Sequence, residues 1–138
     1  MKASLQSVED LTMFQIDNDV HYCRAIPGYD GYWASTLGNI ISTKKKKSEP
    51  TVLAGTNDRG YLKVRLRVDG RTVNRKVHRL VAAAFLKSPD VDPEGDERIQ
   101  INHLDSDKHN NRAANLEYSS ARENVRHAHM MAEVRANA

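Results

Sequence analysis

The feature that most constrains the fold is a segment in which apolar and basic side chains alternate strictly, at residues 61–68. This period of two is typical of a β-strand with one buried face. The Asp69-Gly70 pair that follows is a strong signal for a tight hairpin turn, and residues 72–77 supply a return strand. The chain is therefore expected to contain an antiparallel hairpin with one basic face. The alternating residues are Leu62, Lys63, Val64, Arg65, Leu66, Arg67 and Val68.

The remaining elements are short. Strands are predicted at residues 32–35 and 40–42, on either side of turn residues 36–39. Residues 77–85 predict a helix whose apolar face carries Leu80, Val81, Ala84 and Phe85. Further strands at 99–102 and 116–118 precede a second helix, from Ser119 or Ser120 to about Glu133, and a short helix is expected near residues 8–14. The predicted fold class is α+β, built from small antiparallel hairpins.

Composition excludes several classes of protein. At 138 residues the chain is expected to hold one domain or two small modules. The single Cys23 excludes an internal disulfide framework and zinc sites that need paired cysteines, so no zinc site is expected. No apolar run is long enough to span a membrane and no secretory signal is evident, which predicts a cytoplasmic protein without a membrane partner.

Positive charge is concentrated in one part of the sequence. Residues 21–79 carry thirteen Lys or Arg against four Asp or Glu, a balance of +9, and the flanks 1–20 and 80–138 each carry −3. Such a block is expected of a surface that binds a polyanion, although a solvated surface with a lysine-rich loop would give the same balance. The basic residues that we single out are Lys44, Lys45, Lys46, Lys47, Lys63, Arg65, Arg67, Arg75, Lys76 and Arg79.

Asparagine and histidine are dense between residues 101 and 127. Asn110 and Asn111 are explained by a loop that needs side-chain caps. Asn102 in a strand and Asn124 inside a helix are not, because asparagine is a poor residue at both places. The segments concerned are Ile101-Asn102-His103-Leu104-Asp105, Asn110-Asn111-Arg112, Asn115-Leu116-Glu117-Tyr118 and Glu123-Asn124-Val125-Arg126-His127.

This arrangement resembles the ββα-metal (His-Me finger) motif of HNH endonucleases of the phage and intron homing type. His103, Asn115 and Asn124 stand at its H, N and third positions. The likeness extends upstream, where residues 26–42 are similar to the NUMOD4 module that precedes such nucleases and residues 77–85 resemble the segment that joins the two. The matching upstream residues are Ile26-Pro27-Gly28-Tyr29-Asp30-Gly31-Tyr32 and Ser35-Thr36-Leu37-Gly38-Asn39-Ile40-Ile41-Ser42.

The resemblance implies a nuclease that uses one divalent ion in each active site, Mg²⁺ or Mn²⁺. His103 would be the general base, and Asn115 would orient it and hold the loop. Asn102 and Asn124 would give amide oxygens to the ion, because Mg²⁺ prefers oxygen ligands. His127 is expected either to reach the metal or phosphate or to pack on the surface.

The resemblance also implies a domain order and a partner. Residues 1–23 would be an extension, 24–76 a basic NUMOD4-like module, 77–98 a linking helix and acidic loop, 99–133 the nuclease motif and 134–138 a tail. The expected partner is double-stranded DNA, contacted through the basic residues named above, and a homodimer is compatible with the sequence. A phage origin would place the protein in a bacterial cytoplasm. The alternative is a DNA-binding regulator on the same scaffold with little turnover, and RNA cleavage is the weaker third choice.

Overall fold

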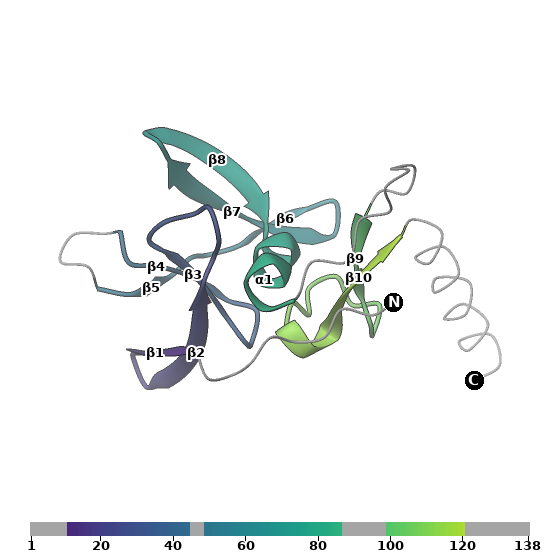
Figure 1. Ribbon diagram of the computed structural model, residues 1–138, viewed down its shortest axis with the longest axis horizontal. Coiled ribbons are helices and arrows are strands. Elements are labelled where there is room, and N and C mark those ends of the chain that lie inside the picture. Colours follow the sequence, from purple (N-terminus) through teal and green to yellow (C-terminus); the bar gives the residue numbers. More distant parts are fainter. Residues whose placement is uncertain (1–10, 45–48, 87–98, 121–138) are drawn as a thin grey trace.

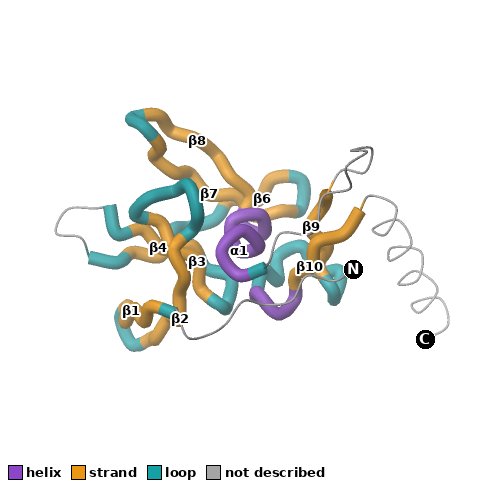
Figure 2. The backbone as a smooth tube through the Cα atoms, in the orientation of Figure 1, coloured by secondary structure: helices purple, strands orange, loops and turns teal. Residues whose placement is uncertain are grey.

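The computed structural model describes residues 11–44, 49–86 and 99–120 of the chain. These residues form three antiparallel sheets around one α-helix, with a short 3₁₀ turn before the last strand (Figure 1). Strand and loop make up most of the described chain, as Figure 2 shows. Within the described ranges, no helix has the length and apolar character needed to cross a bilayer.

The N-terminal sheet has five strands in chain order, so each strand pairs with the next through a hairpin or a short loop. All of its pairs are antiparallel. Its inner positions are filled by small and branched side chains, among them Ala34 and Ile41, which are fully buried. The strands are β1 (Thr12–Ile16), β2 (Asp19–Ala25), β3 (Tyr32–Ser35), β4 (Ile40–Ser42) and β5 (Thr51–Val52).

The second sheet has three strands: β6 (Thr56–Asp58), β7 (Tyr61–Val68) and β8 (Arg71–Lys76). The alternation that predicted β7 is confirmed, because Val64 and Leu66 are buried while Arg65 and Arg67 are exposed. Asp69 and Gly70 both have positive φ angles, 51° and 75°, as the tight turn between β7 and β8 requires.

The third sheet is a hairpin of β9 (Ile99–His103) and β10 (Leu116–Ser120). His103 pairs with Leu116 and Asn102 with Glu117. The loop between the two strands ends in a 3₁₀ turn, η3 (Ala113–Asn115). This hairpin and its loop carry most of the residues that the sequence assigned to chemistry.

Helix α1 (Val77–Phe85) lies at the centre of the molecule and contacts strands of all three sheets (Figure 1). The sequence predicted one apolar face, but the helix is buried on nearly every side, and only Arg79 is exposed. A helix surrounded in this way needs apolar or small residues all round. Its buried residues are Val77, His78, Leu80, Val81, Ala82, Ala84 and Phe85.

Three expectations from the sequence differ from the strands that the structure describes. The helix expected near residues 8–14 is wrong where the structure describes it, because residues 12–14 belong to β1. Phe14 packs edge-to-face on Trp33 at 5.1 Å, and every residue of β1 pairs with a residue of β2. These contacts stabilise the strand over a helix. Strand β2 also crosses the boundary expected after residue 23, and β10 continues through the position at which the second helix was expected to begin.

Candidate active site and nucleic-acid interface

The imidazole of His103 is buried at the end of β9, with 5% of the residue exposed. Its neighbour Asn102 precedes it in the same strand. Successive residues of a strand point to opposite faces, so His103 shares the face of buried Ile101 and Leu116. The histidine is thus turned toward the body of the protein, where α1 contacts β9.

A hydrogen bond from the loop fixes this imidazole. Nε2 of His103 lies 2.8 Å from Oδ1 of Asn111, and Asn111 is itself buried. An amide oxygen only accepts hydrogen bonds, so in the neutral form of the ring Nε2 carries the proton and Nδ1 has the lone pair. This is the tautomer that leaves Nδ1 of His103 available as a base.

The resemblance assigned this orienting role to Asn115, but the hydrogen bonds of Asn115 lie within the loop, and Asn111 contacts the imidazole instead. Oδ1 of Asn115 accepts from the backbone N–H of Asp105 at 3.1 Å. Its Nδ2 donates to Oδ1 of Asp105 at 2.9 Å and to the backbone oxygen of Asn110 at 2.8 Å. Both donor hydrogens are therefore used, and Asn115 holds the loop rather than the imidazole.

Asp105 is the partner around which this loop closes. Its carboxylate also accepts from the Asn110 side chain at 2.7 Å and from the backbone N–H of Asp107 at 2.8 Å. These bonds, the one from Asn110 foremost, lower the pKa of Asp105 below its usual value. Next in the chain, Ser106 has a φ of 65°, a left-handed conformation that favours glycine. The loop is therefore held by polar bonds that outweigh a strained backbone.

Two further rings lie against His103. His78 of α1 lies with its ring centre 5.3 Å away, and Tyr61 stacks on His78 at 4.9 Å. Burial is the main cause that lowers the pKa of His78 from 6.5 to about 3, and neighbouring positive charges add to it. His78 is therefore neutral at physiological pH and adds no second charge beside His103. Its Nδ1 is buried and has no hydrogen-bond partner among the described residues.

The metal ligands expected from the sequence fall into two groups. Asn102 is partly buried on the opposite face of the hairpin, where its Nδ2 donates to Oε1 of Glu117 at 3.3 Å. An amide oxygen and a carboxylate therefore lie side by side, which is chemistry that suits a hard cation such as Mg²⁺. The described residues contain no cluster of three or more His, Cys, Asp or Glu that would hold an ion unaided. Asn124 and His127 lie outside the described residues.

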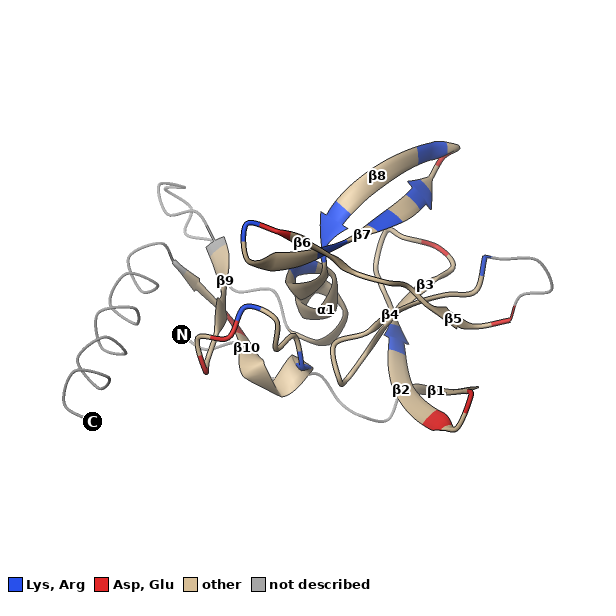
Figure 3. Cartoon of the chain, turned by 180° about the vertical axis from the view of Figure 1, so that it is seen from behind, with Lys and Arg blue, Asp and Glu red and all other residues tan. Residues whose placement is uncertain are grey.

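The predicted DNA-binding cations do not share one surface. Register places Lys63 opposite Lys76, Arg65 opposite Asn74 and Arg67 opposite Thr72, all on the outer face of the β7–β8 ribbon. Arg75 pairs with Val64, so it starts from the other face, and its Nε donates to the Tyr29 hydroxyl at 2.8 Å. Figure 3 shows the positive residues gathered along β7 and β8. The outer face thus carries Lys63, Arg65, Arg67 and Lys76, and Arg79 is exposed on α1.

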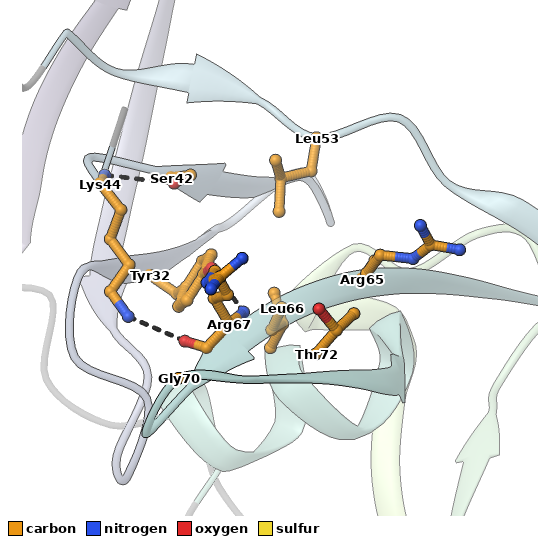
Figure 4. A pocket seen from close by; sticks show the side chains of 9 residues that line it. All are labelled: Tyr32, Ser42, Lys44, Leu53, Arg65, Leu66, Arg67, Gly70 and Thr72. Atoms are coloured by element: carbon orange, nitrogen blue, oxygen red, sulfur yellow. Dashed lines mark hydrogen bonds between the residues drawn. The ribbon is translucent and has the colours of Figure 1, made fainter. Parts of the chain in front are cut away.

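A cavity of about 710 Å³ lies between this ribbon and β4 (Figure 4). Lys44 does not extend freely from its wall: Nζ donates to the backbone oxygen of Arg67 at 2.8 Å and lies over the Tyr32 ring. The Tyr32 hydroxyl accepts from the backbone N–H of Arg67 at 2.7 Å. Lys44 and Tyr32 therefore join the two sheets. The side chains of Arg65 and Arg67 also line the cavity, and no carboxylate of the described residues pairs with them. Lys45, Lys46 and Lys47 lie outside the described residues.

Comparison with known proteins gives a match for the N-terminal strands and ribbon and another for the helix and the β9–β10 hairpin. Residues 24–67 match the NUMOD4 motif, and residues 75–126 match the HNH endonuclease model. The chain thus carries a NUMOD4 motif followed by an HNH endonuclease segment. Its HNH segment includes α1, the β9–β10 hairpin and the loop that bonds to His103.

The relatives and a solved structure agree with this assignment. The chain is 36% identical over 121 residues to HNH endonuclease L247, an uncharacterised protein of Acanthamoeba polyphaga mimivirus, covering 86% of this chain and 28% of L247. It is 37% identical over 99 residues to the "SPbeta prophage-derived putative HNH homing endonuclease YosQ" of Bacillus subtilis strain 168, covering 70% of this chain and 51% of YosQ. The chain therefore spans only about a quarter to a half of these relatives.

A solved structure titled "DNA binding and cleavage by the HNH homing endonuclease I-HmuI" has a similar fold. The TM-score is 0.62 at 28% sequence identity, over 80% of this chain and 59% of that one. The antiparallel architecture around α1 thus resembles the fold of that HNH homing endonuclease.

Two residues that contact His103, Asn111 and His78, were not predicted as site residues from the sequence. Asn111 was explained as a turn residue because it follows Asn110, yet the two side chains bond to different partners, His103 and Asp105. His78 was overlooked because the helix seemed to need only one apolar face. Its spacing to Val81, Ala82 and Phe85, at three, four and seven residues, is the signal that places it on a buried stripe.

The buried neutral state of His78 predicts an acid-sensitive component of stability. Its folded pKa of about 3 lies below the unfolded value of 6.5, so the unfolded chain binds more protons between these values. Stability should therefore fall as pH drops from 6.5 toward 3. We expect wild type to lose about 2 kcal/mol more than His78→Phe between pH 7 and pH 4.5 in urea unfolding. Parallel pH profiles for the two proteins would contradict a neutral buried His78.

Proposed function

We propose that this chain is a metal-dependent DNA endonuclease with His103 as its general base. The observation that carries the proposal is the 2.8 Å bond between Nε2 of His103 and Oδ1 of Asn111. It leaves Nδ1 as the basic nitrogen, and the described residues make no hydrogen bond to that atom. A neutral imidazole with one nitrogen anchored and the other available has the form required of a base at neutral pH.

The catalytic step that we propose is hydrolysis of a phosphodiester bond. Nδ1 of His103 takes a proton from a water molecule as the water oxygen attacks phosphorus and the bond to the 3′ oxygen breaks. The imidazolium that forms keeps its Nε2–H bond to the Asn111 oxygen, which stabilises the positive charge. The neighbouring His78 ring, tilted against His103 at 5.3 Å, is neutral, so this charge develops without a like charge beside it.

A divalent ion would complete the site. Asn102 would hold it through its amide oxygen, beside the Glu117 carboxylate, with Asn124 as a further ligand. When bound, Mg²⁺ would supply Lewis-acid stabilisation of the negative charge on the phosphate and the departing oxygen. Because Asn102 is neutral, we expect affinity for the ion to rise when a DNA phosphate is present.

The outer face of the β7–β8 ribbon is the proposed DNA contact. Lys63 and Lys76 face each other across the ribbon, a like-charge pair that destabilises a sheet unless a polyanion neutralises it. Arg65 and Arg67 are exposed and pair with no carboxylate of the described chain. Such cations mostly bind phosphate, which positions the duplex without reading its sequence.

The direct test is cleavage of supercoiled plasmid with Mg²⁺, with EDTA and with the His103→Ala variant. We expect conversion to open-circle or linear DNA that needs the metal, and a loss of about 10²- to 10⁴-fold in rate for His103→Ala with DNA affinity nearly unchanged. His109→Ala is the matched control, because His109 is exposed in the same loop and bonds to Asn57.

Each outcome of that test is informative. A His103→Ala variant that cuts at the wild-type rate would remove His103 from the mechanism. A wild-type chain that shifts DNA mobility but never cuts would favour the DNA-binding regulator. The product separates a nicking enzyme from one that cuts both strands.

The DNA face gives a second prediction. Arg65→Ala should weaken duplex binding and lower the slope of log affinity against log salt by about 1, because one phosphate contact is lost. Arg75→Ala is the control on the same ribbon, since its guanidinium is bonded to Tyr29 on the other face. Fluorescence anisotropy at several salt concentrations measures both. Equal slopes for Arg65→Ala and wild type would contradict this placement of the DNA.

A further inference from the structure

The turn between β3 and β4 packs directly on the loop that holds His103. The backbone N–H of Ala113 donates to the carbonyl oxygen of Thr36 at 2.9 Å. A Cβ built on Gly38 would lie 2.6 Å from both the carbonyl carbon and the carbonyl oxygen of Asn111 and 3.0 Å from Arg112 N. Figure 2 shows this turn beside the 3₁₀ turn that precedes β10. Two segments about seventy positions apart in the sequence therefore meet backbone to backbone.

Only glycine fits at this contact. Gly38 has a φ of 92°, a conformation that side-chain-bearing residues rarely adopt, and no space exists for a β-carbon. The atoms it would strike are backbone atoms, which cannot rotate away as a flexible side chain does. Gly38 is thus fixed by conformation and by close approach together.

The turn that presents Gly38 is itself rigid. Ser35 is fully buried, and its backbone N–H donates to the Asn39 oxygen at 2.8 Å. Its hydroxyl accepts from the Asn39 N–H at 2.9 Å, and its backbone oxygen accepts from the Gly38 N–H at 3.0 Å. Thr36 N–H donates to Tyr22 in the neighbouring strand at 2.9 Å. A turn bonded in this way can serve as a fixed support.

The residue that rests on Gly38 is the one that orients the base. Asn111 packs its backbone carbonyl against Gly38 and gives its side-chain oxygen to His103. A displacement of the Asn111 backbone therefore moves the atom that fixes the imidazole. We propose that Gly38 is a positioning residue for His103, through which the N-terminal sheet sets the geometry of the nuclease loop.

This inference rests on the proposed function. The contact at Gly38 joins the NUMOD4 segment to the HNH segment. Strand β4 begins just after the Gly38 turn and ends at Ser42, which lines the cavity beside Arg65 and Arg67. One short strand therefore connects the proposed DNA contact to the support of the catalytic loop.

The test compares Gly38→Ala with Gly28→Ala in the full chain. Gly28 has a similar φ of 82°, but a β-carbon there meets nothing within 4 Å, so this control carries the backbone strain without the clash. We expect Gly38→Ala to lower the single-turnover rate at saturating protein by about 10- to 100-fold, with DNA affinity within about twofold of wild type. Gly28→Ala should keep the wild-type rate.

A spectroscopic readout separates this inference from the proposed function. The ¹⁵N signals of the His103 imidazole should shift in Gly38→Ala and stay in place in Gly28→Ala, whether or not the protein cleaves DNA. If wild type cleaves nothing, the proposed function fails and these signals still decide the contact. Wild-type rate together with unchanged His103 signals in Gly38→Ala would overturn the inference.

A second variant tests the same contact if Gly38→Ala does not fold. Ala113→Pro removes the N–H that donates to Thr36 and inserts a ring carbon between the two atoms. Proline suits the local backbone, because Ala113 opens the 3₁₀ turn and Arg112 before it is extended, with φ −57° and ψ 138°. The same selective loss of rate with shifted His103 signals is expected, and an unchanged rate and spectrum would contradict the inference.

Discussion

The structure depends on the burial of one short helix between three small sheets. Helix α1 supplies the common core against which each sheet packs, and a two-stranded sheet such as β9–β10 is at best marginally stable alone. Ala82 and Ala84 are almost fully buried, and their small side chains let strands approach the helix closely. The chemistry follows from this packing, because His78 is drawn into the core with the helix and becomes a neutral ring behind His103.

The β9–β10 hairpin depends on contacts from outside it. His103 is held by Asn111 from its own loop, but that loop is supported from outside by the Gly38 turn on one side. On another side Lys108 lies over the ring of Tyr61 at 4.8 Å. The NUMOD4 and HNH segments therefore pack against each other. The upstream segment carries most of the positive charge and also contacts the loop that holds His103.

Local patterns predicted the elements whose packing is local. The strands at 32–35, 40–42 and 61–68 and the helix at 77–85 have the predicted bounds, because turn residues and strict periodicity define them. β1, β2, β5 and β6 were not predicted, since they are short or weakly patterned and gain their stability from pairing with neighbouring strands. The HNH family was likewise evident from the order of short motifs.

The parts that the sequence could not supply are relations between distant segments. Which asparagine reaches His103 depends on how the loop closes on Asp105. The positions of the asparagines in the sequence do not determine how the loop closes. The cations of the β7–β8 ribbon appeared as one set until the register divided them between two faces. The role of Gly38 was visible only once the turn and the loop were seen in contact.

The central claim is that Asn111 fixes His103 in the tautomer that leaves Nδ1 free as a base. Long-range ¹H–¹⁵N correlation spectra of the histidine side chains in the metal-free protein near pH 8 measure this directly. The account predicts a proton on Nε2 and a bare Nδ1 for His103, with that pattern lost in Asn111→Ala. A proton on Nδ1 in wild type, or a tautomer that Asn111→Ala leaves unchanged, would contradict it.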